Sequence, residues 1–199
     1  MRDEKEWREA IFKKFYPNLK GDLSLKRLKK KGGKTRGHSK RVPIRYLPKR
    51  LSKKDRAAQL KMLRKSRRLY ARGKYYTRKK LPSFQSKESN HIKTARRIYG
   101  VDTIAPSEEL SRATGCSVDA LEKIVAKGEG AYFSSGSRPN QTAQSWGYAR
   151  LGSSLTAGKA AAVDFKILEA GCDHSGKAFQ LAKRAKRKYG YGQSSTKHV

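Results

Sequence analysis

The spacing of apolar residues along the chain predicts a mainly α-helical protein. Apolar side chains recur every three or four residues in many stretches, and few runs alternate with the period of two typical of a half-buried strand. Serine, threonine and glycine stand where such helices would begin and end. The predicted helices cover 3–15, 53–72, 87–99, 108–114, 118–127, 143–156, 159–171 and 175–190.

Two of these predicted helices have narrow apolar faces. The pattern does not decide which residue occupies some positions of each face. The first begins after Ser52, ends at Gly73, and has a stripe made of Ala58, Leu60 or Met62, Leu63, Leu69 and Tyr70. The second begins at Ser86 or Ser89 and ends at Gly100. Its inner face consists of Ile92, Ala95 and Ile98 or Tyr99.

Changes in composition divide the chain into five parts. The stretch 20–50 is rich in glycine, proline and cations but poor in apolar residues, so it cannot bury enough surface to fold alone. We therefore expect a small helical domain with a long extended basic N-terminal arm. The expected parts are an amphipathic helix at 1–19 that docks on this chain or a neighbour, a basic arm at 20–50, a basic helical module at 51–101, a small helical domain at 102–190 and a polar tail at 191–199.

Positive charge is concentrated in the first half of the chain. The formal net charge is +33, and residues 20–99 hold thirty Lys and Arg against three Asp and Glu. Repulsion on this scale destabilises an isolated compact state and favours an anionic partner. Nucleic acid is the most common partner of such a protein, and an anionic membrane or an acidic protein surface is the alternative.

The cations expected to contact this partner lie in the arm and in the basic module. Aromatic residues are interleaved with them and could stack on bases or pack on protein. No sequence pattern of a base-reading domain is present, which favours contacts to phosphates or to an acidic protein. The predicted binding residues are Lys29, Lys30, Lys31, Arg36, Arg41, Arg64, Arg67, Arg68, Arg72, Arg78, Lys79 and Lys80.

Catalytic and metal-binding patterns are missing from the sequence. The four histidines lie mostly in basic or terminal surroundings, and neither a phosphate-binding glycine loop nor a zinc-ligand spacing occurs. The triplet Cys172–Asp173–His174 fits a polar turn better than a ligand set. Two cysteines, Cys116 and Cys172, are expected to be reduced and buried in a reducing compartment. We expect no catalytic residues, no metal and no cofactor.

Two short predicted helices around Gly115 resemble a helix-turn-helix. The second of them carries Asp119 and Glu122 where a DNA-reading helix would present polar or basic side chains. These carboxylates would repel phosphates, which favours a helical hairpin in the core.

The segment 130–153 contrasts with the rest of the chain because its only charges are Arg138 and Arg150. Its serines lack a neighbouring base that could activate them. Pro139 and Asn140 favour a tight turn, and Trp146 lies on a helix face suited to burial. We therefore interpret Arg138, Asn140, Trp146 and Arg150 as a structural clamp, in which an arginine bonds buried carbonyl groups.

Two blocks of the sequence are distinctive. Block 45–101 contains YYTRKK, and block 128–168 contains SGSRPNQT and SWGYARL. Both resemble uncharacterised basic proteins of nucleocytoplasmic large DNA viruses, the algal-virus and mimivirus-like group. The resemblance implies a setting in a virus particle assembled in the host cytoplasm, and it supplies no catalytic residues.

Within that setting two functions compete. The first is a virion structural protein, a minor capsid or core component that bridges neighbouring capsid proteins and an anionic internal surface, either viral DNA or the internal membrane. The second is a non-specific nucleic-acid-binding protein that condenses or packages the genome. The chain has no apolar run of the ~20 residues that a membrane span requires, and its start resembles neither a secretory signal nor a transit peptide.

Overall fold

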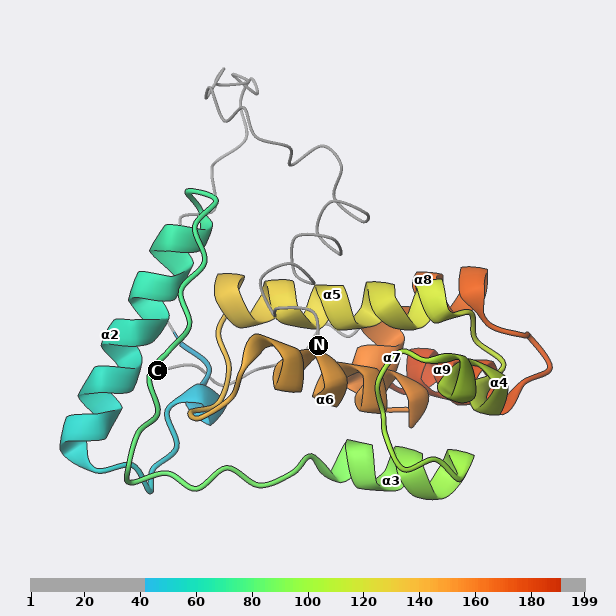
Figure 1. The fold of residues 1–199 in the computed structure, drawn as a ribbon, viewed down its shortest axis with the longest axis horizontal. Helices are drawn as coiled ribbons and strands as arrows, with labels where there is room; N and C mark the ends of the chain where they lie inside the picture. Colours follow the sequence, from blue (N-terminus) through green and yellow to red (C-terminus); the bar gives the residue numbers. More distant parts are fainter. Residues whose placement is uncertain (1–41, 191–199) are drawn as a thin grey trace, which may run out of the picture.

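The computed structural model describes residues 42–190, and their regular structure is entirely helical (Figure 1). The predicted mainly α fold is therefore confirmed. The predicted helix at 3–15, the arm as far as residue 41 and the tail at 191–199 lie outside the described residues. The helices are α2 (Lys53–Tyr70), α3 (Asn90–Tyr99), α4 (Glu108–Thr114), α5 (Val118–Ser134), α6 (Ala143–Leu155), α7 (Lys159–Val163), α8 (Phe165–Gly171) and α9 (Lys177–Tyr189), with a short 3-10 helix η2 (Ile44–Tyr46).

Side-chain caps fix the starts of five helices at the positions that the sequence predicts. Ser52, Ser107 and Ser117 each accept a hydrogen bond from a backbone N–H in the first turn of the helix that follows. Ser89, not Ser86, caps α3. Thr142 forms a capping box with Ser145, in which each side chain bonds the backbone N–H of the other residue.

Helices α5 and α6 form an antiparallel pair at the centre of the structure (Figure 1). We predicted that α5 ends before Gly128, and this is wrong because the helix continues to Ser134. Gly128 and Gly147 face one another where the two helices meet. A Cβ added to Gly128 would lie 2.6 Å from the Cα of Gly147, so the close approach depends on glycine. These glycines therefore serve packing inside the helices, not helix termination.

This contact predicts opposite effects for two neighbouring glycines of α5. Gly128→Ala should lower the free energy of unfolding by about 1–3 kcal/mol because the added methyl group forces the helix backbones apart. Gly130→Ala is the matched control, since its Cβ would meet only the Tyr70 hydroxyl at 3.6 Å. The control should be neutral or more stable by up to about 1 kcal/mol through helix propensity. Urea unfolding of both variants tests this, and equal losses would contradict the packing.

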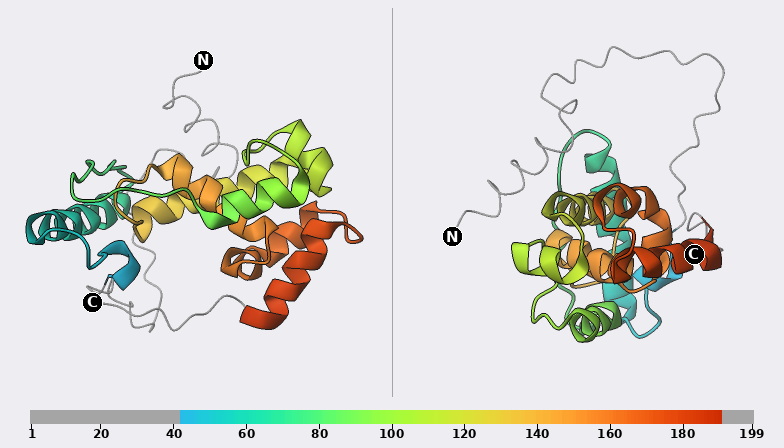
Figure 2. Two further views of the ribbon diagram at one scale, coloured as in Figure 1. Left: turned by 90° about the horizontal axis from the view of Figure 1, so that it is seen from below. Right: turned by 90° about the vertical axis from the view of Figure 1, so that its right-hand side faces the viewer.

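The main core lies between α5–α6 and the helices that surround them. Helix α3 packs against α6, while α7, α8 and α9 gather at the far end of the pair (Figures 1 and 2). Its largest fully buried residues are aliphatic: Leu110, Leu121, Ile124, Val125, Leu151, Leu155 and Leu168. Ala95 of α3 belongs to the same core, so packing is continuous across the domain boundary that we predicted at residues 101 and 102.

The stretch 159–171, which we predicted as one helix, is two. Helix α7 ends at Val163 and α8 begins at Phe165, with Asp164 between them. The side chain of Asp164 is fully buried and accepts hydrogen bonds from Arg150 and Ser154. The break between α7 and α8 therefore places the Asp164 carboxylate inside the domain, where Arg150 and Ser154 of α6 donate hydrogen bonds to it.

A disulfide joins Cys116 and Cys172, which corrects our expectation of two reduced thiols. Both residues are buried. Backbone hydrogen bonds flank the bond, from Ser117 N–H to Gly171 O and from Asp173 N–H to Gly115 O, each 2.7 Å long. The start of α5 is thus fastened to the end of α8. A separation of 56 residues gave no local sequence signal for this pairing.

The disulfide predicts that reduction destabilises the protein. The loop-entropy relation gives a loss of about 4 kcal/mol for a cross-link across 56 residues. Unfolding of the wild type by guanidinium with and without dithiothreitol should show this difference. The Cys116→Ala/Cys172→Ala variant is the control, and its midpoint should not respond to dithiothreitol. A wild type that is equally indifferent would show that the cysteines are not paired.

Helix α2 stands at a steep angle to α5 and α6 and packs on the C-terminal end of α5 (Figure 1). Its inner face buries Met62 and Leu63, but also the polar residues Gln59 and Ser66. Residues 42–50, which we assigned to the extended arm, are instead folded here: Val42, Tyr46 and Leu47 pack against Leu63. No helix in the described part of the chain is long and apolar enough to cross a membrane.

Candidate anion-binding groove

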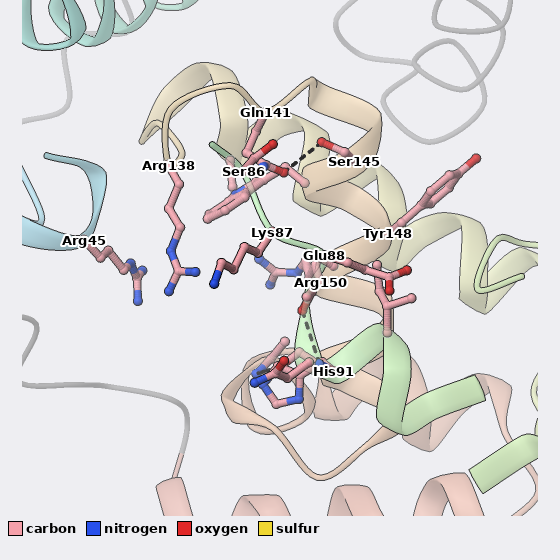
Figure 3. A pocket seen from close by; sticks show the side chains of 18 of the residues that line it. Arg45, Ser86, Lys87, Glu88, His91, Arg138, Gln141, Ser145, Tyr148 and Arg150 are labelled. Atoms are coloured by element: carbon pink, nitrogen blue, oxygen red, sulfur yellow. Dashed lines mark hydrogen bonds between the residues drawn. The ribbon is translucent and has the colours of Figure 1, made fainter. Parts of the chain in front are cut away.

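A groove of about 1700 Å³ lies between the segment at 43–50, the connection that leads from α2 to α3, the loop before α6, and α6 itself (Figure 3). Its charged lining is almost entirely cationic. One carboxylate, Glu88, lines it, against nine basic residues: Arg45, Arg50, Arg67, Lys80, Lys87, Arg96, Arg138, Arg150 and Lys159. Such a lining attracts anions and concentrates them in the groove.

Three of these cations point into the same open space. Figure 3 shows the charged ends of Arg45, Lys87 and Arg138 approaching one another from three different segments. All three side chains are exposed. No carboxylate within 42–190 forms an ion pair with any of them. We call these three residues the cation cluster.

Two other arginines of the lining, Arg96 and Arg67, are held by contacts within the protein. Arg96 binds Glu88 at 2.8 Å, so the single acidic residue of the lining is neutralised. Arg67 donates two hydrogen bonds to the carbonyl of Ser135, at 2.8 and 3.1 Å. The groove therefore keeps its net positive charge for a partner.

Arg150 and Asp164 form a buried ion pair beside the groove. Nε and Nη2 of Arg150 donate to the two carboxylate oxygens of Asp164, each at 2.7 Å. Lys127 reaches the same carboxylate at 2.7 Å, and Ser154 donates at 3.1 Å. Bidentate geometry holds the guanidinium plane in one orientation. Arg150 thus bonds a buried carboxylate that joins α6 to the α7–α8 break, whereas we expected carbonyl groups.

Asn140 fixes the loop at 135–142, which carries Arg138. Its Oδ1 accepts from the Leu81 N–H at 2.7 Å, and its Nδ2 donates to the carbonyls of Leu81 and Phe84. Asn140 has a positive φ of 56°, a conformation that asparagine tolerates better than most residues. Its side chain therefore fastens the loop to the connection that leads to Lys87.

Arg78 lies inside the protein, which corrects its assignment as a partner-binding residue. It is 8% exposed, and its guanidinium donates to Ser66 Oγ, Tyr132 O and Ser137 Oγ at 3.2, 3.1 and 2.7 Å. The guanidinium also lies 3.7 Å from the centre of the Tyr132 ring. Burial lowers the pKa of Arg78, while Tyr132 opposes this shift, and arginine stays protonated. Arg78 thus supports the loop from within.

Trp146 lies where two small apolar clusters meet. It packs beside Leu63 and Tyr46 in one cluster and beside Tyr132 in the other. Its ring meets that of Tyr46 edge to face, with centroids 5.9 Å apart. Trp146 also lines the groove, so part of its side chain faces the same open space as the cation cluster.

The remaining predicted binding residues divide into three groups. Lys80 lines the groove. Arg64, Arg68, Arg72 and Lys79 are exposed but lie outside it. Lys29, Lys30, Lys31, Arg36 and Arg41 lie outside the described residues. Arg45 and Lys87 were not among the predicted binding residues, and Arg138 was predicted as part of a structural clamp. The signal for Arg138 was its position as a lone charge in a neutral, tightly specified loop.

The described residues offer little for catalysis or metal binding. No three His, Cys, Asp or Glu side chains within 42–190 gather as a metal site requires. His91 lines the groove with Nδ1 2.9 Å from Thr156 Oγ1, and burial lowers its pKa, so it is neutral at pH 7. His174 stacks on Phe179, with ring centroids 4.3 Å apart.

Fold and site together define a basic helical protein with a groove lined mainly by cations. Residues 43–170 match the model of a family of unknown function (DUF5824), and the chain belongs to that family. This match contains both of the distinctive sequence blocks, 45–101 and 128–168. No curated protein and no solved structure matches the chain.

Two neighbouring loop residues should separate stability from binding. Asn140→Ala should lower the free energy of unfolding by about 2–4 kcal/mol, because backbone groups of Leu81 and Phe84 lose their partner. Arg138→Ala, two positions away, should change it by no more than about 0.5 kcal/mol, since the side chain is exposed. Urea unfolding measures both. A destabilising Arg138→Ala combined with a neutral Asn140→Ala would contradict the roles assigned to this loop.

Proposed function

We propose that the protein is a virion structural protein, a minor capsid or core component of a large DNA virus, that holds an anionic partner in its groove. The observation that carries this proposal is the groove itself, with nine basic residues and one paired acidic residue along its walls. A groove of this kind suits an extended anionic chain better than a flat membrane surface. The viral setting rests on the resemblance of the two sequence blocks.

A structural role agrees with how the charge is distributed over the protein. The groove faces one partner, while the exposed cations of α2 and of the last turn of α9 lie elsewhere on the surface. A component with several separate basic surfaces can bridge neighbouring capsid proteins and an anionic internal surface. No catalytic step is part of the proposal, and binding alone accounts for the residues that line the groove.

The second candidate function is non-specific nucleic-acid binding for genome condensation or packaging. The combination of aromatic and basic residues in the groove favours it, since the half-buried Trp146 lines the same groove as the cations. The two functions differ in whether the protein stays with the shell or with the genome when particles are opened.

Fractionation of purified particles of the encoding virus tests the proposal. We expect quantitative mass spectrometry to find the protein in intact particles at a constant ratio to the main capsid protein. After gentle disassembly, release together with capsid proteins indicates a shell component, and retention by nuclease-sensitive material indicates genome packaging. Absence from intact particles would refute the virion role under either reading.

A further inference from the structure

We propose that the groove binds the phosphodiester backbone of nucleic acid, with Arg45, Lys87 and Arg138 as its phosphate-binding residues. This inference deepens the proposed function, because it identifies the chemical class of the anionic partner. It rests on the convergence of the cation cluster in Figure 3 and on the residues around it.

The geometry of the cluster suits a phosphate group. Arg45 lies in η2, Lys87 precedes the α3 cap, and Arg138 lies in the loop before α6. Three cations from separate segments can donate to one group from several directions, as a tetrahedral phosphate accepts them. Mutual repulsion of three unpaired cations costs free energy in the empty groove, and a bound anion removes that cost.

The loop is built so that Arg138 stays in position without a partner. The backbone on one side is fixed by Ser137, whose Oγ accepts from Arg78 at 2.7 Å and donates to the Arg138 carbonyl at 2.8 Å. Gln59 donates to the Ser137 carbonyl at 3.3 Å. On the other side the loop is fixed by Asn140. A residue held in this way loses little conformational entropy of the backbone on binding.

Neutral residues beside the cluster fit nucleic acid better than an acidic peptide. Trp146 lines the groove from α6, and its half-buried ring offers a surface on which a base could stack, whereas the carboxylates of an acidic peptide cannot stack on it. Ser86 adds a hydroxyl group and Gln141 an amide group that can donate to phosphate oxygens (Figure 3). The groove therefore combines phosphate donors with aromatic surface.

The test compares two triple variants of the full chain that lose the same charge. The groove variant is Arg45→Gln/Lys87→Gln/Arg138→Gln, and the matched control is Arg64→Gln/Arg68→Gln/Arg72→Gln, with Arg64 and Arg68 on the exposed side of α2 and Arg72 in the turn after it. All six side chains are exposed, so neither variant should change the unfolding midpoint. Basic residues elsewhere in the chain contribute equally to both proteins.

Binding is measured by fluorescence anisotropy with a labelled 20-nucleotide oligothymidylate over a salt series. We expect the groove variant to bind at least about tenfold more weakly at low salt, and its slope of log K against log salt to be shallower by about 2. The control should retain wild-type affinity within about threefold. A 20-base-pair duplex run in parallel shows which form of nucleic acid supplies the phosphates.

Two results would overturn the inference. Equal losses in both triple variants would mean that binding follows net charge and not the groove. A polyglutamate peptide that binds more tightly than either nucleic acid, and loses affinity only in the groove variant, would assign the groove to an acidic protein. Neither result bears on whether the protein is present in virus particles, which the fractionation experiment tests. Failure of the inference and failure of the proposed function are therefore distinguishable.

Discussion

A buried arginine holds together the part of the structure on which the groove depends. The guanidinium of Arg78 bonds Ser66 of α2, the Tyr132 carbonyl of α5 and Ser137 of the loop, while its own N–H donates to the Tyr132 hydroxyl at 3.2 Å. A buried charge is costly unless each donor finds an acceptor, so this network tolerates little displacement of any of its members. The positions of α2, α5 and the loop are thereby set relative to one another.

The chain uses its cations in two different ways. Arg78 and Arg150 are inside or partly inside the protein, where hydroxyl, carbonyl and carboxylate oxygens hold them in fixed orientations. Arg45, Lys87 and Arg138 are exposed and converge on one space without an acidic partner in the described ranges. The first kind builds the walls of the groove, and the second kind gives the groove its charge. Net charge alone does not distinguish the two.

Local patterns made the helices predictable, whereas the site depends on contacts between distant segments. Capping residues such as Ser52 and Thr142 bond a backbone N–H three residues ahead, so they indicate a helix start from the local sequence alone. Both caps are present in the structure. The hydrogen bonds of Arg78 to Tyr132 and Ser137 span more than fifty residues, so nothing beside Arg78 in the sequence separates it from exposed neighbours such as Lys79. The pairing of Cys116 with Cys172 was missed for the same reason.

Close helix packing, and not helix termination, requires the glycine at position 128. We predicted a helix end at Gly128, but this residue lies inside α5. The absence of a side chain there allows the backbone of α6 to approach closely at Gly147. This contact depends on the pairing of α5 with α6, so the local sequence does not indicate it. Arg138 was grouped with Asn140 because both belong to one neutral loop. Asn140 holds that loop, and Arg138 projects from it into the groove (Figure 3). We propose that this lone charge binds the partner.

Photo-cross-linking of the full chain to a single-stranded oligonucleotide carrying 4-thiothymidine tests the central claim most directly, because it reports where the nucleic acid lies. Mass spectrometry of the adducts should find them mainly on peptides from 43–50, 85–93 and 135–150, the segments that form the groove. Adducts confined to residues 1–41 or to the exposed side of α2, with the groove peptides unmodified, would contradict the account.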